Sequence, residues 1–140
     1  MFIKQVSVFV ENETGRLSDY TKILKDNNID MKAVCIADTV DFGILRCIVD
    51  DPDKAVNVLN ENGFTASITT VIAVSFENVP GALHSVLEKL ADEGIGVDYI
   101  YSMIRSETGK ATLIFKVGDP EKAGKVLMEN HISLLCMKDI

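Results

Sequence analysis

The sequence lacks the features that mark membrane, fibrous and disordered proteins. Three prolines and nine glycines in 140 residues exclude a linker-rich or collagen-like chain. No apolar run approaches the roughly 18 residues that a membrane span needs. The first residues lack a basic region, a continuous apolar stretch and a small-residue cleavage site, so we expect no signal peptide and a cytoplasmic location. A chain that is 47% hydrophobic and 25% charged is typical of one or two small globular domains.

The chain also has few basic residues, and they form no cluster. Fourteen basic side chains stand against 21 acidic ones, which gives a formal net charge of -7. Proteins that bind nucleic acid neutralise phosphates with a coherent Lys/Arg face. This composition therefore predicts no nucleic-acid partner, and attachment to a membrane surface is disfavoured for the same reason.

Reactive clusters are scarce as well. Cys35, Cys47 and Cys136 are odd in number, far apart and without a Cys-x-x-Cys pair, so we interpret them as buried reduced thiols. Only His84 and His131 could supply an imidazole, and neither has a Ser, Cys or carboxylate at a spacing that suggests a triad. No glycine-rich phosphate loop occurs. We therefore predict no metal, no cofactor and no catalytic residues, and thus a protein that is not an enzyme.

The strongest pattern is an internal repeat. Residues 8–29 align with residues 74–95 at a shift of 66, and residues 45–62 align with 113–130 at a shift of 68. The second block pairs DPDKA with DPEKA. The two extra residues of the second copy fall near 106–110, where a hairpin turn tolerates them. We expect two units, residues 1–69 and 70–140, joined with almost no linker at 68–71.

Each unit shows the periodicities of strand, helix, strand, strand, helix, strand. Alternating apolar residues in 6–10 and 72–76 predict first strands, and apolar residues three and four apart in 17–24 and 83–90 predict first helices. Asp51 and Asp119 precede prolines and predict capped second helices that run to Asn62 and Asn130. The remaining strands are expected at 31–36, 44–49 and 64–69, and at 97–104, 112–117 and 132–137, with the first hairpin turning through 37–43.

This order predicts an α+β fold of two tandem ferredoxin-like βαββαβ units, their antiparallel sheets side by side with the helices on one face. A unit of about 70 residues is marginal alone, so we expect the two to support each other. Some strands carry apolar residues on both faces, as where Ile44, Arg46 and Ile48 alternate with Leu45, Cys47 and Val49, which suggests that another chain covers part of the helix-free face. We therefore expect a homodimer.

A family resemblance rests on the segments between the first strand and first helix of each unit. ENVPGAL, residues 77–83, resembles the signature of ACT domains, and ENETGRL, residues 11–17, is its counterpart. The whole chain resembles stand-alone tandem ACT proteins. This resemblance implies a non-enzymatic regulatory protein that binds a free L-amino acid between its two modules. The alternative is a detached regulatory subunit of an amino-acid biosynthetic enzyme, such as a branched-chain amino-acid synthase; a small enzyme of an unrecognised kind is a third possibility.

The chemistry of these loops agrees with a carboxylate ligand. Gly15 and Gly81 let the backbone approach a bound group, and the unpaired N–H groups of a helix start attract an anion. Asn12 and Asn78 could contact the ligand or cap the helix. Pro80 fixes the second loop, whereas the first has Thr14 at this position and is freer.

The resemblance places the ligand between the loop of one module and the start of the second strand of the neighbouring module. At those strand starts Asp30 could accept an ammonium group, whereas Gly96 offers only backbone, so the two sites need not be equivalent. The candidate ligand-binding residues are Asn12, Thr14, Gly15, Arg16, Leu17, Asp30, Met31, Asn78, Val79, Pro80, Gly81, Ala82, Leu83, Gly96 and Val97.

Overall fold

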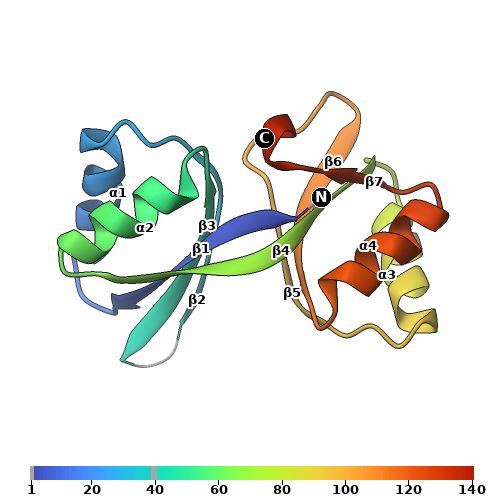
Figure 1. The fold of residues 1–140 in the computed structure, drawn as a ribbon, viewed down its shortest axis with the longest axis horizontal. Coiled ribbons are helices and arrows are strands. Elements are labelled where there is room, and N and C mark those ends of the chain that lie inside the picture. Colours follow the sequence, from blue (N-terminus) through green and yellow to red (C-terminus); the bar gives the residue numbers. More distant parts are fainter. Residues whose placement is uncertain (1, 39–40) are drawn as a thin grey trace. The chain divides into compact units, whose positions relative to one another are not determined.

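The computed structural model describes residues 2–38 and 41–140, which form two compact units. The first unit is Lys4–Thr69, and the second comprises residues 2–3 and Thr70–Ile140. Each repeats the order predicted from the sequence, so the fold is two tandem ferredoxin-like βαββαβ units. Figure 1 shows the elements of both units in chain order.

The first unit is built from four strands and two helices. They are β1 (Ile3–Glu11), α1 (Arg16–Asp26), β2 (Met31–Asp38), β3 (Phe42–Val49), α2 (Pro52–Glu61) and the beginning of β4 (Thr65–Glu77). The strands lie in the order β2-β3-β1-β4. β3 is antiparallel to both β1 and β2, with Val8 opposite Leu45.

The second unit repeats this arrangement. It comprises the rest of β4, then α3 (Ala82–Asp92), β5 (Val97–Ser102), β6 (Lys110–Val117), α4 (Pro120–Glu129), β7 (Ser133–Leu135) and a final 3-10 turn, η1 (Met137–Asp139). The strand order is β5-β6-β4-β7. Val74 lies opposite Leu113, the equivalents of Val8 and Leu45.

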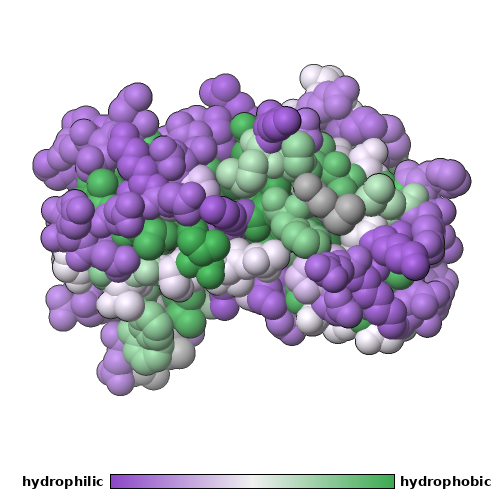
Figure 2. Space-filling model, viewed as in Figure 1, coloured by the Kyte–Doolittle hydropathy of each residue, from purple (hydrophilic) through white to green (hydrophobic). Residues whose placement is uncertain are grey.

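Each unit has its own hydrophobic core between the sheet and its pair of helices. In the first unit, alternate residues of β1 and β3 pack with Tyr20 and Leu24 of α1 and Leu59 of α2. In the second, alternate residues of β4 and β6 pack with Leu90 of α3 and Leu127 of α4. The helices of a unit therefore lie on one face of its sheet. Figure 2 shows mainly hydrophilic residues on the outer surfaces of these helices.

Local signals in the sequence determine where the helices begin and end. The carboxylates of Asp51 and Asp119 each accept a backbone N–H bond at 3.1 Å in the first turn of α2 and α4. Pro52 and Pro120 are the first helical residues, a position that tolerates proline because its N–H has no acceptor within the helix. These predicted caps are confirmed, as are the ends at Asn62 and Asn130.

The structure corrects the expected strands at the ends of the units. The strands expected at 64–69 and 72–76 are one continuous strand, β4, because the chain runs without a bend from its pairing with β1 to its pairing with β6. The strand expected at 132–137 covers only Ser133–Leu135. The backbone N–H of Cys136 donates to the Asp139 carboxylate at 2.8 Å and starts a 3-10 turn there. Residues 39 and 40 of the turn expected at 37–43 lie outside the described residues.

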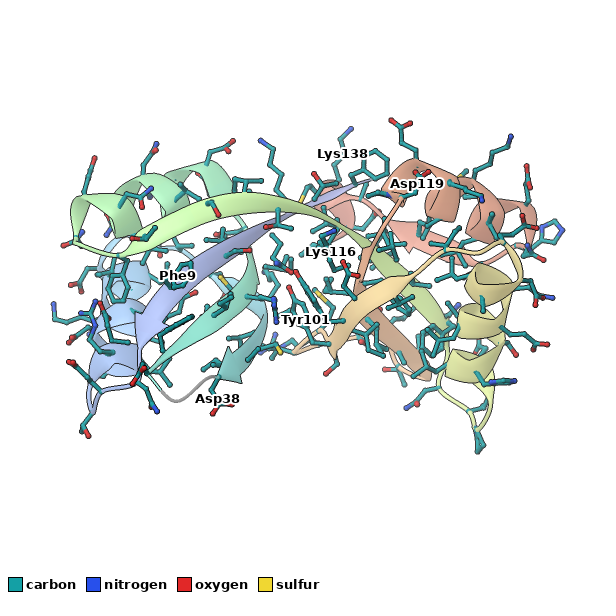
Figure 3. All side chains as sticks on the ribbon, turned by 90° about the horizontal axis from the view of Figure 1, so that it is seen from below. Phe9, Asp38, Tyr101, Lys116, Asp119 and Lys138 are labelled. Atoms are coloured by element: carbon teal, nitrogen blue, oxygen red, sulfur yellow. The ribbon has the colours of Figure 1, made fainter. Side chains whose placement is uncertain are left out.

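The interpretation of all three cysteines as buried is wrong for two of them. Cys47 is fully buried, whereas Cys35 and Cys136 are half-buried. The helix-free face of the first unit also differs along its length. Ile48 is buried within the chain, but Phe9 and Phe42 are 51% and 40% exposed, with ring centroids 5.3 Å apart. Figure 3 shows Phe9 on β1.

Candidate functional site

The two loops that carry the repeated motif have the same backbone. The N–H of Asn12 donates to the carbonyl of Asp41 at 3.2 Å, and the N–H of Asn78 donates to that of Gly109 at 3.0 Å. Each asparagine is thereby tied to the hairpin beside it. The connection from strand to helix has the same hydrogen bond in both units, although only four of its seven residues are identical.

A glycine in the left-handed conformation starts the helix in each loop. Gly15 has φ 92° and Gly81 has φ 87°, and each is the N-cap residue of its helix. Residues with a Cβ adopt this conformation at a cost, which explains glycine at both positions. A Cβ built at either glycine would meet no heavy atom within 4 Å, so the outer side of each turn is open.

The first turn of α1 and of α3 presents N–H groups for which the described chain supplies no acceptor. The N–H of Ala82 donates back to Val79 at 3.2 Å, and the helical pattern resumes where Ser85 donates to Gly81 at 3.0 Å. Between them, the N–H groups of Leu83 and His84 have no acceptor among the described residues. Such groups, together with the helix dipole, favour an anion at this end.

The asparagines do not serve as the N-cap residues, because Gly15 and Gly81 occupy that position. Asn12 and Asn78 lie three residues earlier. The side chain of Asn78 makes no hydrogen bond to the described part of the chain. For Asn78 the capping alternative is therefore not realised, and its amide is available to another group.

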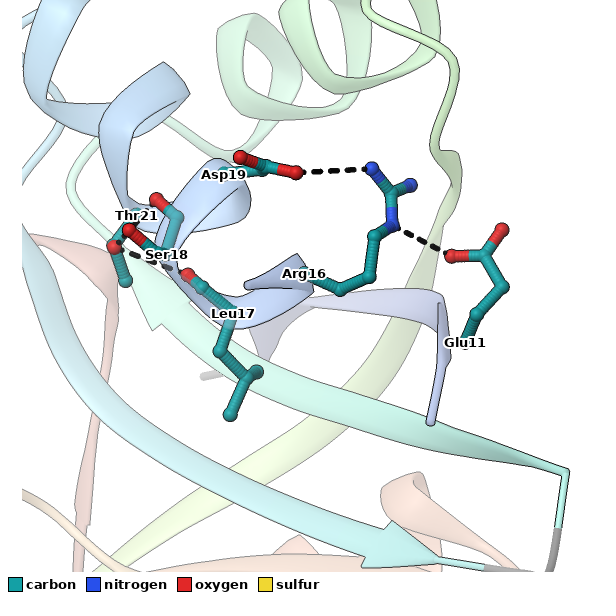
Figure 4. A network of polar contacts seen from close by, with 6 residues as sticks. All are labelled: Glu11, Arg16, Leu17, Ser18, Asp19 and Thr21. Carbon is teal, nitrogen blue, oxygen red and sulfur yellow. Dashed lines mark hydrogen bonds and ion pairs between the residues drawn. The ribbon is translucent and has the colours of Figure 1, made fainter. Parts of the chain in front are cut away.

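The first loop carries a network of charged side chains. The Nε atom of Arg16 donates to the carboxylate of Glu11 at 2.8 Å, and a terminal nitrogen of its guanidinium lies 3.4 Å from Asp19 (Figure 4). The guanidinium also lies over the ring of Phe64, 4.1 Å from its centroid. A hydrogen bond from its own backbone N–H and then the bond from Arg16 lower the pKa of Glu11. The bond to Glu11 raises the pKa of Arg16 in turn.

The second loop has no such network, because Ala82 replaces Arg16. Glu77, the equivalent of Glu11, faces Lys110 at 3.4 Å. Val79 is 58% exposed, and Pro80 limits the conformations of the turn. The residues after the left-handed glycine therefore offer backbone and apolar surface rather than charge.

The starts of the second strands differ as well. In the first unit the Asp30 carboxylate pairs with Lys32 at 2.7 Å, and the Asp30 N–H donates to the side chain of Asp50 at 3.1 Å. The equivalents in the second unit are Gly96 and Gly118, which join through their backbones at 3.0 Å. One turn thus carries two carboxylates and the other carries no side chain.

Within a unit the structure does not bring the loop and the strand start together. Gly15 precedes α1, whereas Asp30 and Met31 follow its other end. An 11-residue helix separates the two ends by about 16 Å, at about 1.5 Å per residue. The same holds for Gly81 and Gly96 on either side of α3. Within one unit these two features therefore do not form a single site.

Sequence reasoning missed the partners of Arg16, since Asp19 and Phe64 lie outside the repeated motif.

His84, considered as a ligand contact, has a 79% exposed side chain and lies 3.5 Å from Glu88 on the next turn. Among residues 2–38 and 41–140, no three His, Cys, Asp or Glu side chains are grouped to hold a metal ion. No helix in those ranges combines the length and apolar character required to cross a bilayer.

Comparison with known proteins identifies the family. The chain matches the ACT domain pair family over residues 1–140, and it belongs to that family. ACT domains are regulatory modules that bind amino acids. No curated protein matches the chain.

Solved structures share the fold of this chain. Protein BT0572 from Bacteroides thetaiotaomicron is 43% identical, with a TM-score of 0.93 over 99% of this chain and 95% of its own. The regulatory subunit of aspartate kinase from Thermus thermophilus shares the fold at 15% identity, with a TM-score of 0.67 over 90% of this chain and 91% of its own. Aspartate kinase from Clostridium acetobutylicum, at 14% identity and a TM-score of 0.52, aligns with 91% of this chain over 33% of its own.

Proposed function

We propose that the chain is a non-enzymatic regulatory protein that binds a free L-amino acid through the loops 11–17 and 77–83. The observation that carries the proposal is the left-handed glycine at the start of α1 and α3, after which the first N–H groups of each helix have no acceptor in the described part of the chain. A ligand carboxylate would accept hydrogen bonds from them and gain from the helix dipole. The family supports the same class of ligand.

The ammonium group of an amino acid needs acceptors at the other end of the ligand. The side-chain carbonyl of Asn78 is available for this role, because the Asn78 amide has no partner in the described chain. Asp30 would offer a carboxylate, but there the ammonium must compete with Lys32 at 2.7 Å. These acceptors distinguish an amino acid from a simple carboxylic acid.

We expect the two loops to differ in affinity. In the first loop Glu11 and Asp19 already neutralise the guanidinium of Arg16, and a ligand carboxylate would have to compete with them. In the second loop no acidic side chain of the described residues forms an ion pair with the helix start, and Pro80 restricts the unbound turn. The second loop therefore has less to rearrange on binding.

The proposal is tested by thermal unfolding of the full chain with each of the twenty L-amino acids at millimolar concentration. A ligand at one hundred times its Kd stabilises the protein by about 2.7 kcal/mol, which raises the Tm by several degrees. No shift with any amino acid would reject the proposal.

A glycine pair locates the site once a ligand is found. Gly81→Ala strains a left-handed residue at the loop, and Gly94→Ala strains one at φ 69° beyond the other end of α3. Both face open space, so both variants lose a similar stability. Only Gly81→Ala should weaken binding, measured by calorimetry as a fall of tenfold or more. Equal affinities would place the ligand elsewhere.

The alternative, a detached regulatory subunit of an amino-acid biosynthetic enzyme, uses the same loops. It differs in requiring a larger catalytic chain as a partner. Affinity purification from the native host under the ligand conditions found above separates the two: a stoichiometric catalytic chain supports the subunit, and recovery of the chain alone supports the independent regulator.

A further inference from the structure

Asn62 and Gly63, at the end of α2, form the only Asn-Gly pair in the sequence. Asn62 is the C-cap residue of the helix, and Gly63 follows it in the left-handed conformation with φ 84°. Both residues are exposed. Glycine has no Cβ, so the peptide nitrogen of Gly63 can approach the side chain before it with little hindrance. Asn62 is therefore chemically different from the other asparagines of the chain.

The second unit has the same helix end without the glycine. Asn130 is the C-cap residue of α4, and His131 follows it at φ 59°. The side-chain amide of Asn130 donates to the carbonyl of Val126 at 2.8 Å. The amide of Asn62 donates to the carbonyl of Val58 in the same way, at 2.7 Å. Both asparagines are exposed, so the repeat provides two similar caps that differ in the residue after the asparagine.

We propose that Asn62 is a site of spontaneous covalent modification, at which its side-chain amide becomes a carboxylate. The peptide nitrogen of Gly63 loses its proton and bonds to the side-chain carbonyl carbon of Asn62. The bond from that carbon to Nδ2 breaks, and Nδ2 leaves with the proton as ammonia. Water then opens the five-membered imide ring at either carbonyl, which yields aspartate or isoaspartate. The reaction is independent of the proposed amino-acid loops.

The folded cap slows this reaction. The N–H of Gly63 donates to the carbonyl of Asn60 at 3.3 Å, and the amide of Asn62 is bonded to Val58. With ψ 21° at Asn62, the Gly63 nitrogen is turned away from the side chain, so ring closure requires rotation about the Cα–C bond of Asn62. Helix ends open more readily than helix centres. The rate of modification therefore depends on opening of the last turn of α2.

The product is unfavourable at this end of the helix. The last turn of α2, residues 58–61, contains Glu61 and no basic residue, and the negative end of the helix dipole lies here. A carboxylate adds a further negative charge. It also lacks the N–H donor of the amide, so the bond to the carbonyl of Val58 is lost. Modification of Asn62 therefore destabilises the first unit.

Peptide mass spectrometry of the full chain, aged in a mildly alkaline buffer, tests the site. Conversion at Asn62 should be at least tenfold faster than at Asn130, because only Asn62 precedes glycine. Fragmentation of the peptide is required to assign the converted residue, since Asn60 lies two positions away. Equal rates at Asn62 and Asn130 would overturn the proposal.

His131→Gly is the matched variant, because it places a glycine after Asn130 in the similar cap. Glycine adopts φ 59° without strain, so the variant should remain folded, which circular dichroism checks. Conversion at Asn130 should rise at least tenfold and approach the rate at Asn62. An unchanged rate at Asn130 would show that the following glycine does not control the reaction, and the proposal would fail.

Urea denaturation tests the consequence for stability. Ageing should lower the unfolding midpoint of the native chain, and Asn62→Asp, which reproduces one product, should lower it without ageing. Asn62→Ser has no side-chain amide and cannot form the imide, so its midpoint should stay constant on ageing. If ageing lowered the midpoint of Asn62→Ser as much as that of the native chain, the damaging change would lie elsewhere, and the assignment to Asn62 would be wrong.

Discussion

The two units have nearly the same backbone but fill their cores differently. Tyr20 of α1 and Cys47 of β3 are fully buried in the first unit, and the Tyr20 hydroxyl donates to the Cys47 sulfur at 2.8 Å. The equivalent positions in the second unit are Val86 of α3 and Phe115 of β6, which belong to one core. In the first unit the large side chain of this pair is on the helix, and in the second unit it is on the strand.

The difference shows which parts of the sequence specify the fold and which are adjustable. The elements that set the chain path recur in both units. Lys54 and Lys122 donate to the carbonyls of Asn27 and Glu93 at 2.6 and 2.8 Å, and both bonds join the second helix to the end of the first. The core requires a total volume rather than particular residues, as expected for cores that keep volume and pattern.

The largest expected effect is a loss of stability when the large side chain of this pair is removed from the first unit. Tyr20→Val in the first unit leaves a cavity and removes the hydrogen bond, at a cost of about 3 kcal/mol in the free energy of unfolding. Adding Cys47→Phe should recover more than half of that loss, because the pair then matches the second unit. Urea denaturation of the full chain measures both, with Cys47→Phe alone as the overpacked reference.

The reciprocal exchange provides the control. Phe115→Cys should destabilise the second unit, and Val86→Tyr should compensate for it. Strictly additive losses in both units would show that the two positions do not share one volume.

The next effect is a pH dependence of the free energy of unfolding that only the first unit should show. Burial raises the pKa of the Cys47 thiol to about 11, against its ordinary value of 9.0, and the hydrogen bond from Tyr20 partly opposes that rise. The unfolded thiol therefore ionises first, and stability falls as the pH rises from 9 to 11, by about 2–3 kcal/mol from this group. Below pH 9 the group contributes nothing to the pH dependence.

Chemical denaturation at a series of pH values measures this contribution as the difference between the native protein and Cys47→Ala. Since Phe115 replaces this cysteine in the second unit, only the first unit should show it. Parallel pH profiles for the two proteins would contradict the assignment.

A smaller loss of stability, equal in the two units, is expected when the cap of either second helix is removed. Asp51→Ala and Asp119→Ala each remove one charged acceptor from a backbone N–H at 3.1 Å, at a cost of about 1 kcal/mol. The measurement is the free energy of unfolding of each variant. If the two losses differed by more than this amount, α2 and α4 would differ in stability despite their similar backbones.

Most of the fold could be predicted because its signals are local and occur twice. Asp-Pro, the asparagines at helix ends and the alternating strands each specify a short segment, and the shift of 66 to 68 residues makes each copy a check on the other. The continuous β4 could not be foreseen in this way. Periodicity predicts strand on both sides of residues 68–71, but whether the chain bends between two strands depends on their tertiary pairing.

The candidate site was predictable only as two loops. The repeated Glu-Asn-x-x-Gly-x-Leu pattern located Gly15 and Gly81, and the structure gives both the left-handed conformation. The environment of Arg16 was not predictable, because Phe64 is 48 positions away in the sequence and reaches the arginine only through the packed core.

The smallest effect concerns the charges that distinguish the two loops. Arg16→Ala should raise the pKa of Glu11 toward its ordinary value of 4.5, because it removes a hydrogen bond and a positive charge, while the backbone hydrogen bond of Glu11 persists and keeps part of the depression. A carboxyl titration by NMR follows this change. At high salt the screened attraction should shrink the difference between native protein and Arg16→Ala, whereas the hydrogen bond should survive. A Glu11 titration that is unchanged in Arg16→Ala would mean that the guanidinium does not bind Glu11 in solution, and the two loops would then offer a carboxylate ligand more nearly equal sites.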